Sequence, residues 1–145
     1  MRNALPSLVN LFGRGIDVDT ISCKFCDNGG DDLAHLYYNC SIVRETRRLL
    51  KNWLRVHLPD NEPKGVMMWH KDLRITAKNR SVLEAILFIW WWHIWKERNN
   101  VLHNGKHEDN VSIVNSIISL SYLWISNRDR KKVYAWNDWI ENPLS

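Results

Sequence analysis

The chain has 145 residues, of which 45% are hydrophobic and 25% are charged, and its formal net charge is +4 at pH 7. These values are ordinary for a globular domain, so they exclude disordered and fibrous classes. The length is enough for one compact unit that needs no disulfides, and the mild positive charge permits an anionic partner without requiring one.

The cysteines and the N-terminus bear on the cellular compartment. All three cysteines lie between positions 23 and 40, and no apolar stretch follows Arg2 that would serve as a secretory signal. An odd number of clustered cysteines in a reducing compartment indicates metal binding rather than disulfide pairing. We therefore expect an intracellular chain, nuclear or cytoplasmic, that is not secreted.

The first half of the chain is predicted to form a zinc module over residues 1–58. A short helix is expected over residues 5–15, because Pro6 suits a first turn and Gly13 and Gly15 suit an end. Residues 23–40 form a loop rich in Asn, Gly and Asp that has no sustained apolar period, so something other than a core must hold it. Metal would serve that purpose.

An amphipathic helix is predicted over residues 41–58, with an apolar side and a basic side. The spacing i, i+4, i+7, i+11 places four cations in one stripe that is a candidate phosphate-binding surface or, equally, a solvated helix face. The apolar side comprises Ile42, Thr46, Leu49, Leu50, Trp53 and Leu54, and the basic side comprises Arg44, Arg48, Lys51 and Arg55.

Residues 59–80 are predicted to be a connection, and residues 81–145 a tryptophan-rich helical region. Ser81 and Glu84 have the spacing of a capping box, which opens a helix that runs to about Val101 before Asn104 and Gly105 end it. Its unbroken apolar run, residues 85–92, is far shorter than the roughly 20 residues needed to cross a bilayer, so no membrane partner is expected.

A further helix is predicted to begin at Asp109 or Asn110, followed by a basic segment at 128–132 and a tail with Trp136 and Trp139. The residues expected to face inward are Val111, Val114, Ile117, Ile118 and Trp124. The predicted fold is therefore mainly α: a short N-terminal helix, a zinc-knuckle-like loop and about three longer helices.

Cys23, Cys26, His35 and Cys40 have the spacing C-x2-C-x8-H-x4-C, which suits one tetrahedral Zn²⁺ with three thiolates and one imidazole. Four protein ligands leave no open position for water or substrate, so the site is predicted to be structural and not catalytic. The alternative of three reduced cysteines in a small core is disfavoured, because the loop contains too few apolar residues to form one.

Two other patterns resemble metal sites but are disfavoured as such. The turn from Gly29 to Asp32 resembles the catalytic turn of polymerases, but it lies between zinc ligands and no third carboxylate accompanies it. His103 and His107 are separated by Gly105, which disfavours a shared helix face. Neither a phosphate-binding loop nor a nucleophile motif is present, so we expect no enzyme and no small-molecule substrate.

A family resemblance rests on three segments: residues 4–16, the Cys23 and Cys26 pair, and Asp32-Leu-Ala-His35-Leu-Tyr-Tyr-Asn-Cys40. Together they resemble the reverse-transcriptase zinc-binding domain of plant LINE-type (non-LTR) retrotransposons, over roughly residues 4–58. Residues 92–99 and 135–139 resemble segments that follow this domain in the same polyproteins. Where the family commonly has two basic residues before its Gly-Ile, this chain has Gly13 and Arg14.

The resemblance implies a C-terminal polyprotein fragment that helps to grip RNA or DNA and lacks the polymerase's catalytic residues. Arg14 is a candidate contact by this resemblance, together with the cations of residues 44–55. The runner-up hypothesis is a protein-interaction module, in which zinc is purely structural and residues Trp90 to Trp95 dock a partner, such as other domains of the parent reverse transcriptase. A third hypothesis, a catalytic zinc hydrolase, is the least favoured, because it needs an open coordination position.

Overall fold

The computed structural model describes residues 13–15, 23, 25–26, 29–32, 35–57, 73–106, 108–128 and 131–145. This part of the chain contains five helices, three of them long, which confirms the predicted mainly α class. The predicted helix over residues 5–15 lies outside the described residues except at 13–15, and the predicted connection lies outside them except at 73–80. The helices are η1 (His35–Asn39), α2 (Ser41–Leu54), α4 (Ala77–Asn104), α5 (Asn110–Arg128) and α6 (Trp136–Glu141).

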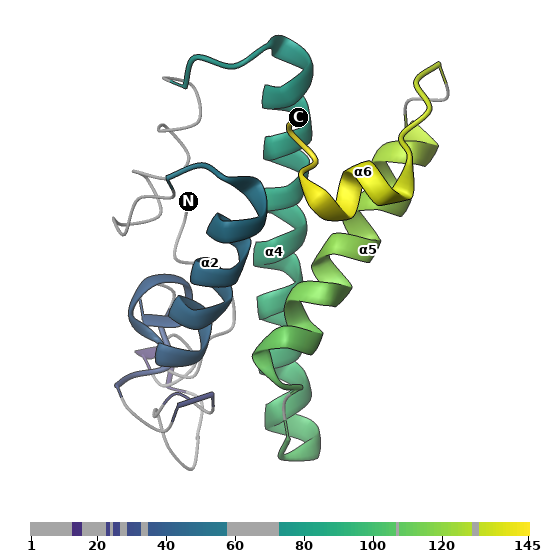
Figure 1. Cartoon of the computed structure of the whole chain (residues 1–145). Coiled ribbons are helices and arrows are strands. Elements are labelled where there is room, and N and C mark those ends of the chain that lie inside the picture. Colours follow the sequence, from purple (N-terminus) through teal and green to yellow (C-terminus); the bar gives the residue numbers. More distant parts are fainter. Residues whose placement is uncertain are drawn as a thin grey trace.

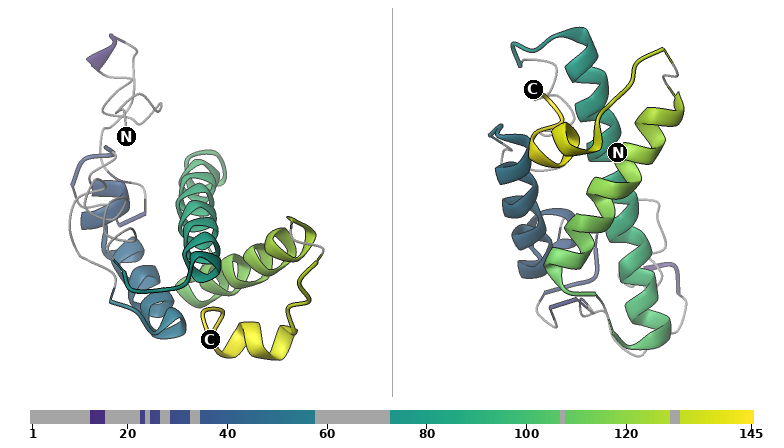
Figure 2. Two further views of the ribbon diagram at one scale, coloured as in Figure 1. Left: turned by 90° about the horizontal axis from the view of Figure 1, so that it is seen from above. Right: turned by 45° about the vertical axis from the view of Figure 1, so that its right-hand side comes forward.

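The three long helices surround one core. In Figure 1 α2 and α4 stand beside each other, and α5 crosses α4 and packs against both of them. The view from above in Figure 2 shows the same three helices, with α6 packed beside α5. Residues of both predicted halves supply the fully buried side chains, among them Val43, Leu50, Leu83, Ile86, Ile94, Ile113 and Ile117.

Helix α2 is shorter than predicted and is rotated relative to the expected face. It ends at Leu54, because Arg55 takes the left-handed conformation (φ 55°) and its N–H donates to the Lys51 carbonyl at 2.9 Å. Ile42 and Leu49, which were expected to face inward, are only half-buried, whereas Arg47 is 4% exposed. The rotation is possible because the Arg47 guanidinium donates to the Tyr37 carbonyl at 2.7 Å.

Helix α4 begins at Ala77 and not at Ser81. Thr76 is the N-cap, and its hydroxyl accepts a hydrogen bond from the Asn79 N–H at 3.1 Å, so the predicted capping box lies inside the helix. The C-terminal prediction is confirmed: the helix ends at Asn104, and Gly105 (φ 78°) donates to the Val101 carbonyl. Among the described helices, none has the length and apolar character needed to cross a membrane.

Helix α5 is capped as predicted, because Asp109 accepts hydrogen bonds from the N–H and the hydroxyl of Ser112. Its buried face differs from the prediction, since Val111 is 59% exposed and Trp124 is 42% exposed. The helix is apolar on several sides, so its partners decide which side is buried. The residues that face the core are Ile113, Val114, Ile117, Ser121 and Ile125.

The predicted C-terminal tail folds back as α6. Trp139 is 2% exposed and its indole N–H donates to the Ile118 carbonyl on α5 at 3.1 Å. The indole N–H of Trp53 on α2 donates to the carbonyl of Trp139 at 2.9 Å, and the two rings meet edge to face. The C-terminal segment therefore links α2 to α5.

Candidate metal centre and cationic helix face

Cys23, Cys26, His35 and Cys40 are brought together at the start of α2, as the spacing predicted. Their four ligand atoms all lie within 4.8 Å of one another. The Sγ atoms of Cys23 and Cys40 are 3.9 Å apart, and Cys26 Sγ is 3.3 Å from His35 Nε2. Tetrahedral bonds of about 2.0 to 2.3 Å separate neighbouring ligand atoms by about 3.5 to 4 Å, so the cluster has the dimensions of a metal site.

The backbone around the cluster positions these side chains. The Cys23 N–H donates to the Gly29 carbonyl at 3.0 Å, which closes the loop that carries Cys26. The single π-helical turn of η1 closes with a 2.7 Å bond from the Cys40 N–H to the His35 carbonyl. Asp32 accepts from the His35 N–H at 2.8 Å, so it acts as a cap in the turn and not as a metal ligand.

Gly29 lies directly against the ring of His35. Its φ is +75°, and a Cβ at this position would be 2.7 Å from His35 Nδ1 and 2.8 Å from Cε1. A side chain would therefore both strain the backbone and push the imidazole away. This packing leaves Nε2 as the ring nitrogen that faces Cys26.

The electrostatics of the cluster favour a thiolate. The close contact between the two buried sulfurs lowers the pKa of Cys23 to about 5, assisted by backbone N–H groups of Cys26 and Phe25, and raises the pKa of Cys40. The amides of Val43 and Ile42 at the start of α2 oppose the rise at Cys40. Amides directed at sulfur support metal ligation, because the ligand form of cysteine is the thiolate.

A buried ion pair that the sequence analysis missed anchors the metal loop to α4. Arg98 Nε donates to Asp31 Oδ1 at 3.2 Å, and a second guanidinium nitrogen contacts Oδ2. The two side chains are only 3% and 1% exposed, and Arg98 also lies over the Trp95 ring at 4.7 Å. No local pattern signals this pair, because Asp31 resembles an ordinary turn residue.

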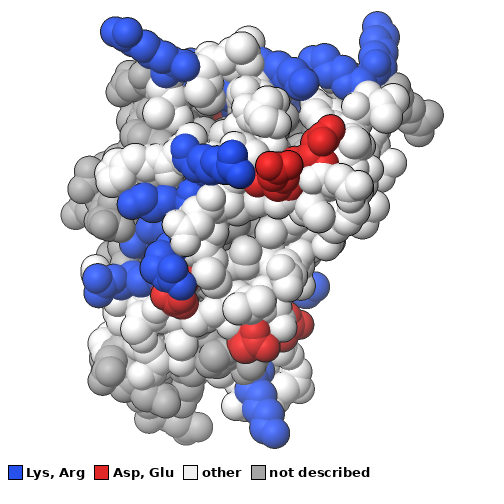
Figure 3. All heavy atoms as spheres, in the orientation of Figure 1, with Lys and Arg blue, Asp and Glu red and all other residues white. Residues whose placement is uncertain are grey.

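The predicted cations on and after α2 are exposed, but they do not form one continuous stripe. Figure 3 shows Lys and Arg side chains gathered over the α2 side of the molecule. Arg44 and Lys51 project from the helix, while Arg48 pairs with Glu45 at 2.6 Å. Arg55 follows the helix end and lies 3.9 Å from Glu141, so it departs from the predicted helical register.

Arg14 is exposed but is not brought to this face. In the view from above (Figure 2), segment 13–15, drawn in purple, lies apart from α2. The predicted nucleic-acid contacts therefore do not share one surface, because Arg14 lies apart from the cations on and after α2.

Comparison with known protein families, with curated proteins and with solved structures finds no match to this chain. A metal ion held by all four ligands would have no open position, so the centre suits a structural role and not catalysis.

Proposed function

We propose that this chain is a zinc-stabilised nucleic-acid-binding module, an accessory part of a reverse transcriptase of the LINE type that it resembles, with no catalytic activity of its own. Zn²⁺ is the metal that a set of three thiolates and one imidazole favours, since it prefers tetrahedral sulfur and nitrogen ligands. The residues that would hold it are Cys23, Cys26, His35 and Cys40.

The observation that carries this proposal is the position of Cys40, which belongs to the metal cluster and is also the N-cap residue of α2. A metal at the cluster would fix the start of a helix whose outer face presents Arg44 and Lys51. Zn²⁺ with three thiolates has a net charge of about −1, so the cations and not the metal would attract phosphate. Arg48 can join them, because an exposed pair such as Arg48–Glu45 is worth only about 0.2 to 1 kcal/mol.

The test measures binding to single-stranded RNA and DNA over a range of salt concentrations. Changing Arg44 and Lys51 to Gln should weaken both ligands alike and reduce the slope of log K against log salt by about 1.4, because each lost contact releases about 0.7 fewer counterions. The matched control changes Lys106 and Lys131 to Gln, which removes the same charge from exposed positions elsewhere. Equal slopes in the two folded double variants would contradict the proposal.

A second candidate function is protein interaction, supported by an apolar groove between α4 and α5. The groove has a volume of about 330 Å³ and is lined by Phe88, Ile89, Trp92, Leu120 and Trp124. Within the candidate docking segment Trp90 to Trp95, Trp92 is 48% exposed and would contact a partner, whereas Trp90 is 1% exposed and belongs to the core. An α-helix points consecutive residues about 100° apart, so only part of this segment faces outward.

Salt separates the two functions. Binding through phosphates weakens steeply as salt rises, whereas binding through an apolar groove hardly responds. In the second case Trp92→Ala would abolish binding to the other domains of the parent reverse transcriptase, and the variant lacking Arg44 and Lys51 would bind them normally. If binding weakens steeply with salt and Trp92→Ala leaves this response unchanged, the protein-interaction function is excluded.

A further inference from the structure

The apolar groove between α4 and α5 exposes large aromatic rings. Phe88 is 60% exposed, Trp92 is 48% exposed and Trp124 is 42% exposed, and all three line the groove. The rings of Phe88 and Trp124 have centroids 6.3 Å apart and are inclined by only 30°, so they form one aromatic surface that spans the two helices. Exposed apolar surface gathered in one place in this way marks a binding site.

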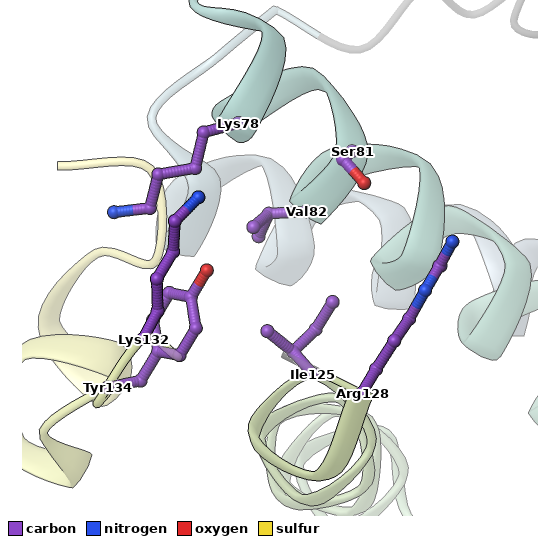
Figure 4. A pocket seen from close by; sticks show the side chains of 7 residues that line it. All are labelled: Lys78, Ser81, Val82, Ile125, Arg128, Lys132 and Tyr134. Atoms are coloured by element: carbon purple, nitrogen blue, oxygen red, sulfur yellow. The ribbon is translucent and has the colours of Figure 1, made fainter. Parts of the chain in front are cut away.

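Each of the two tryptophans in the groove is followed, one helical turn later, by a cation. Lys96 Nζ is 5.2 Å from the centroid of the Trp92 ring, and the guanidinium carbon of Arg128 is 5.5 Å from that of Trp124. Because α4 and α5 run in opposite directions (Figure 1), the two cations lie toward opposite ends of the groove. Figure 4 shows Arg128 on the opposite side of a neighbouring cavity from Lys132, so Arg128 is grouped with its tryptophan and not with that lysine.

The distribution of charge identifies the end of the groove where an anion would lie. No carboxylate belongs to the described lining, and the sequence of α5 contains no acidic residue. The acidic residues of α4 are Glu97, which is 7% exposed, and Glu84, which precedes Phe88 by one turn. Glu84 and Lys96 therefore stand at opposite ends of the exposed row on α4, and an anion is favoured at the Lys96 end. A purely apolar protein segment would match the rings but would give this cation no counterpart.

We propose that the groove binds unpaired bases of single-stranded RNA or DNA, which stack on Trp92 and Trp124 while Lys96 contacts the adjoining phosphate. A free base offers a flat aromatic face to such a platform, whereas the faces of paired bases in a duplex are already covered. An exposed cation–π contact is weaker than base stacking, so a base can replace the cation on the ring. The inference rests on the proposed nucleic-acid function and extends it, because α2 was assigned contacts with phosphates only.

The first experiment follows the indole N–H signals of the ¹⁵N-labelled, zinc-loaded chain. The probe is a short oligothymidylate, compared at equal ionic strength with an abasic strand of the same length and with the same oligothymidylate annealed to its complement. We expect only the single strand with bases to shift the Trp92 and Trp124 signals saturably. Trp136 is the internal control, because it is 41% exposed but lies on α6, outside the described lining. Equal shifts at Trp136, or equal shifts with the abasic strand, would overturn the proposal.

A matched pair of variants tests the stacking. Trp92→Ala should weaken binding of the oligothymidylate at least about fivefold and binding of the abasic strand less than about twofold, because only a base stacks on the ring. Trp92→Phe keeps an aromatic face and should retain most of the affinity, and Trp136→Ala should change neither probe. The slope of log K against log salt should be the same in all of them, since no phosphate contact is removed. Equal weakening of both probes by Trp92→Ala would overturn the proposal.

A second matched pair tests the phosphate contact. Lys96→Gln should reduce the salt slope by about 0.7 for the oligothymidylate and for the abasic strand alike, because one contact with a single strand releases about that many counterions. Lys106→Gln removes the same charge from an exposed position just after the end of α4, outside the described lining, and should leave the slope unchanged. Equal slopes in the two variants would overturn the contact assigned to Lys96.

The variants also separate this inference from the α2 function and from protein interaction. If the variant lacking Arg44 and Lys51 binds the oligothymidylate normally while Trp92→Ala binds it weakly, the groove is the site and the assignment to α2 fails. The opposite pattern overturns the groove inference and leaves the α2 function intact. If Trp92→Ala abolishes binding to the other domains of the parent reverse transcriptase and leaves strand binding unchanged, the groove docks a protein and the inference is overturned.

Discussion

Arg98 on α4 and Asp31 in the metal loop form a buried ion pair across 67 positions of sequence. The guanidinium contacts both carboxylate oxygens, and both side chains are almost completely removed from solvent. The loop is therefore held at two places, by the cluster of four candidate metal ligands at its ends and by this pair in its middle. Of the two, only the metal site was predictable from the spacing of residues.

Removing one partner of this pair should destabilise the fold strongly. Arg98→Gln or Asp31→Asn should lower the free energy of unfolding by about 3 to 5 kcal/mol, because the remaining charge stays buried without its partner. The control is Glu45→Gln, which breaks the exposed pair with Arg48 and should cost less than about 1 kcal/mol. Urea unfolding of the three variants makes the comparison, and similar costs at both pairs would contradict the buried role of Asp31.

Gly29→Ala should displace His35 from the cluster. The new Cβ would lie 2.7 Å from Nδ1, on a backbone that is already at φ +75°. Gly105→Ala is the matched control, because its φ is +78° and no heavy atom lies within 4 Å of the added Cβ. We expect both variants to be destabilised by about 1 kcal/mol of backbone strain, and only Gly29→Ala to lose Zn²⁺ to a chelator at a much lower concentration. Equal retention of metal by the two would show that the ring accommodates the change.

Cys26→Ser and Cys40→Ser should both reduce the bound zinc to well below one ion per chain, because serine does not supply a thiolate. Cys40 is also the N-cap of α2, but serine is a good N-cap, so α2 should persist in both variants. Protease cleavage should therefore increase within residues 23–40, while helical circular dichroism changes little. Loss of most of the helical signal would mean instead that the loop and the helical core unfold together.

His93 should make stability depend on pH. It is 7% exposed, neither ring nitrogen has a hydrogen-bond partner among the described residues, and desolvation lowers its pKa although Glu97 and Glu108 oppose this. The unfolded chain, with a His pKa of about 6.5, takes up a proton that the folded chain resists. Stability should therefore be level above about pH 6.5 and should fall as the pH decreases below that value.

The His93 contribution is isolated by comparison with variants. His93→Leu should reduce the slope of unfolding free energy against pH between about pH 5 and 6.5, whereas His103→Gln, at an exposed position of the same helix, should leave it unchanged. Protonation of the metal ligands affects all of these chains alike, so it cancels in the comparison. An unchanged slope in a folded His93→Leu variant would show that another group is responsible.

Trp139 and Trp92 should differ sharply in their effect on stability. Trp139→Ala removes a 2% exposed ring that contacts Trp53 and donates to Ile118, and should cost about 3 to 5 kcal/mol. Trp92→Ala removes a ring that is 48% exposed, and should cost less than about 1.5 kcal/mol. Thermal unfolding measures the two losses of stability. Acrylamide should quench the tryptophan fluorescence of Trp92→Ala less than that of the wild type, because the variant lacks one exposed ring. A small cost at Trp139 would mean that α6 is not part of the stable core.

Sequence alone was sufficient to predict the features that depend on interactions between residues close together in the chain. The spacing of Cys23, Cys26, His35 and Cys40 predicts a cluster because short turns bring ligands together over short distances. Gly105 ends α4 and Asp109 begins α5 through hydrogen bonds to residues within one helical turn. Such signals depend on neighbours along the chain, so they are readable without the fold.

Tertiary structure decided which faces are buried and which distant groups meet. Helices α4 and α5 are apolar on several sides, so their packing partners, and not their periodicity, turn Val111 and Trp124 outward. Arg47 is directed inward because the Tyr37 carbonyl accepts from it, and Asp31 meets Arg98 because the loop packs against α4. A buried polar group is stable only where a partner satisfies it, and these partners are set by the three-dimensional arrangement and not by sequence distance.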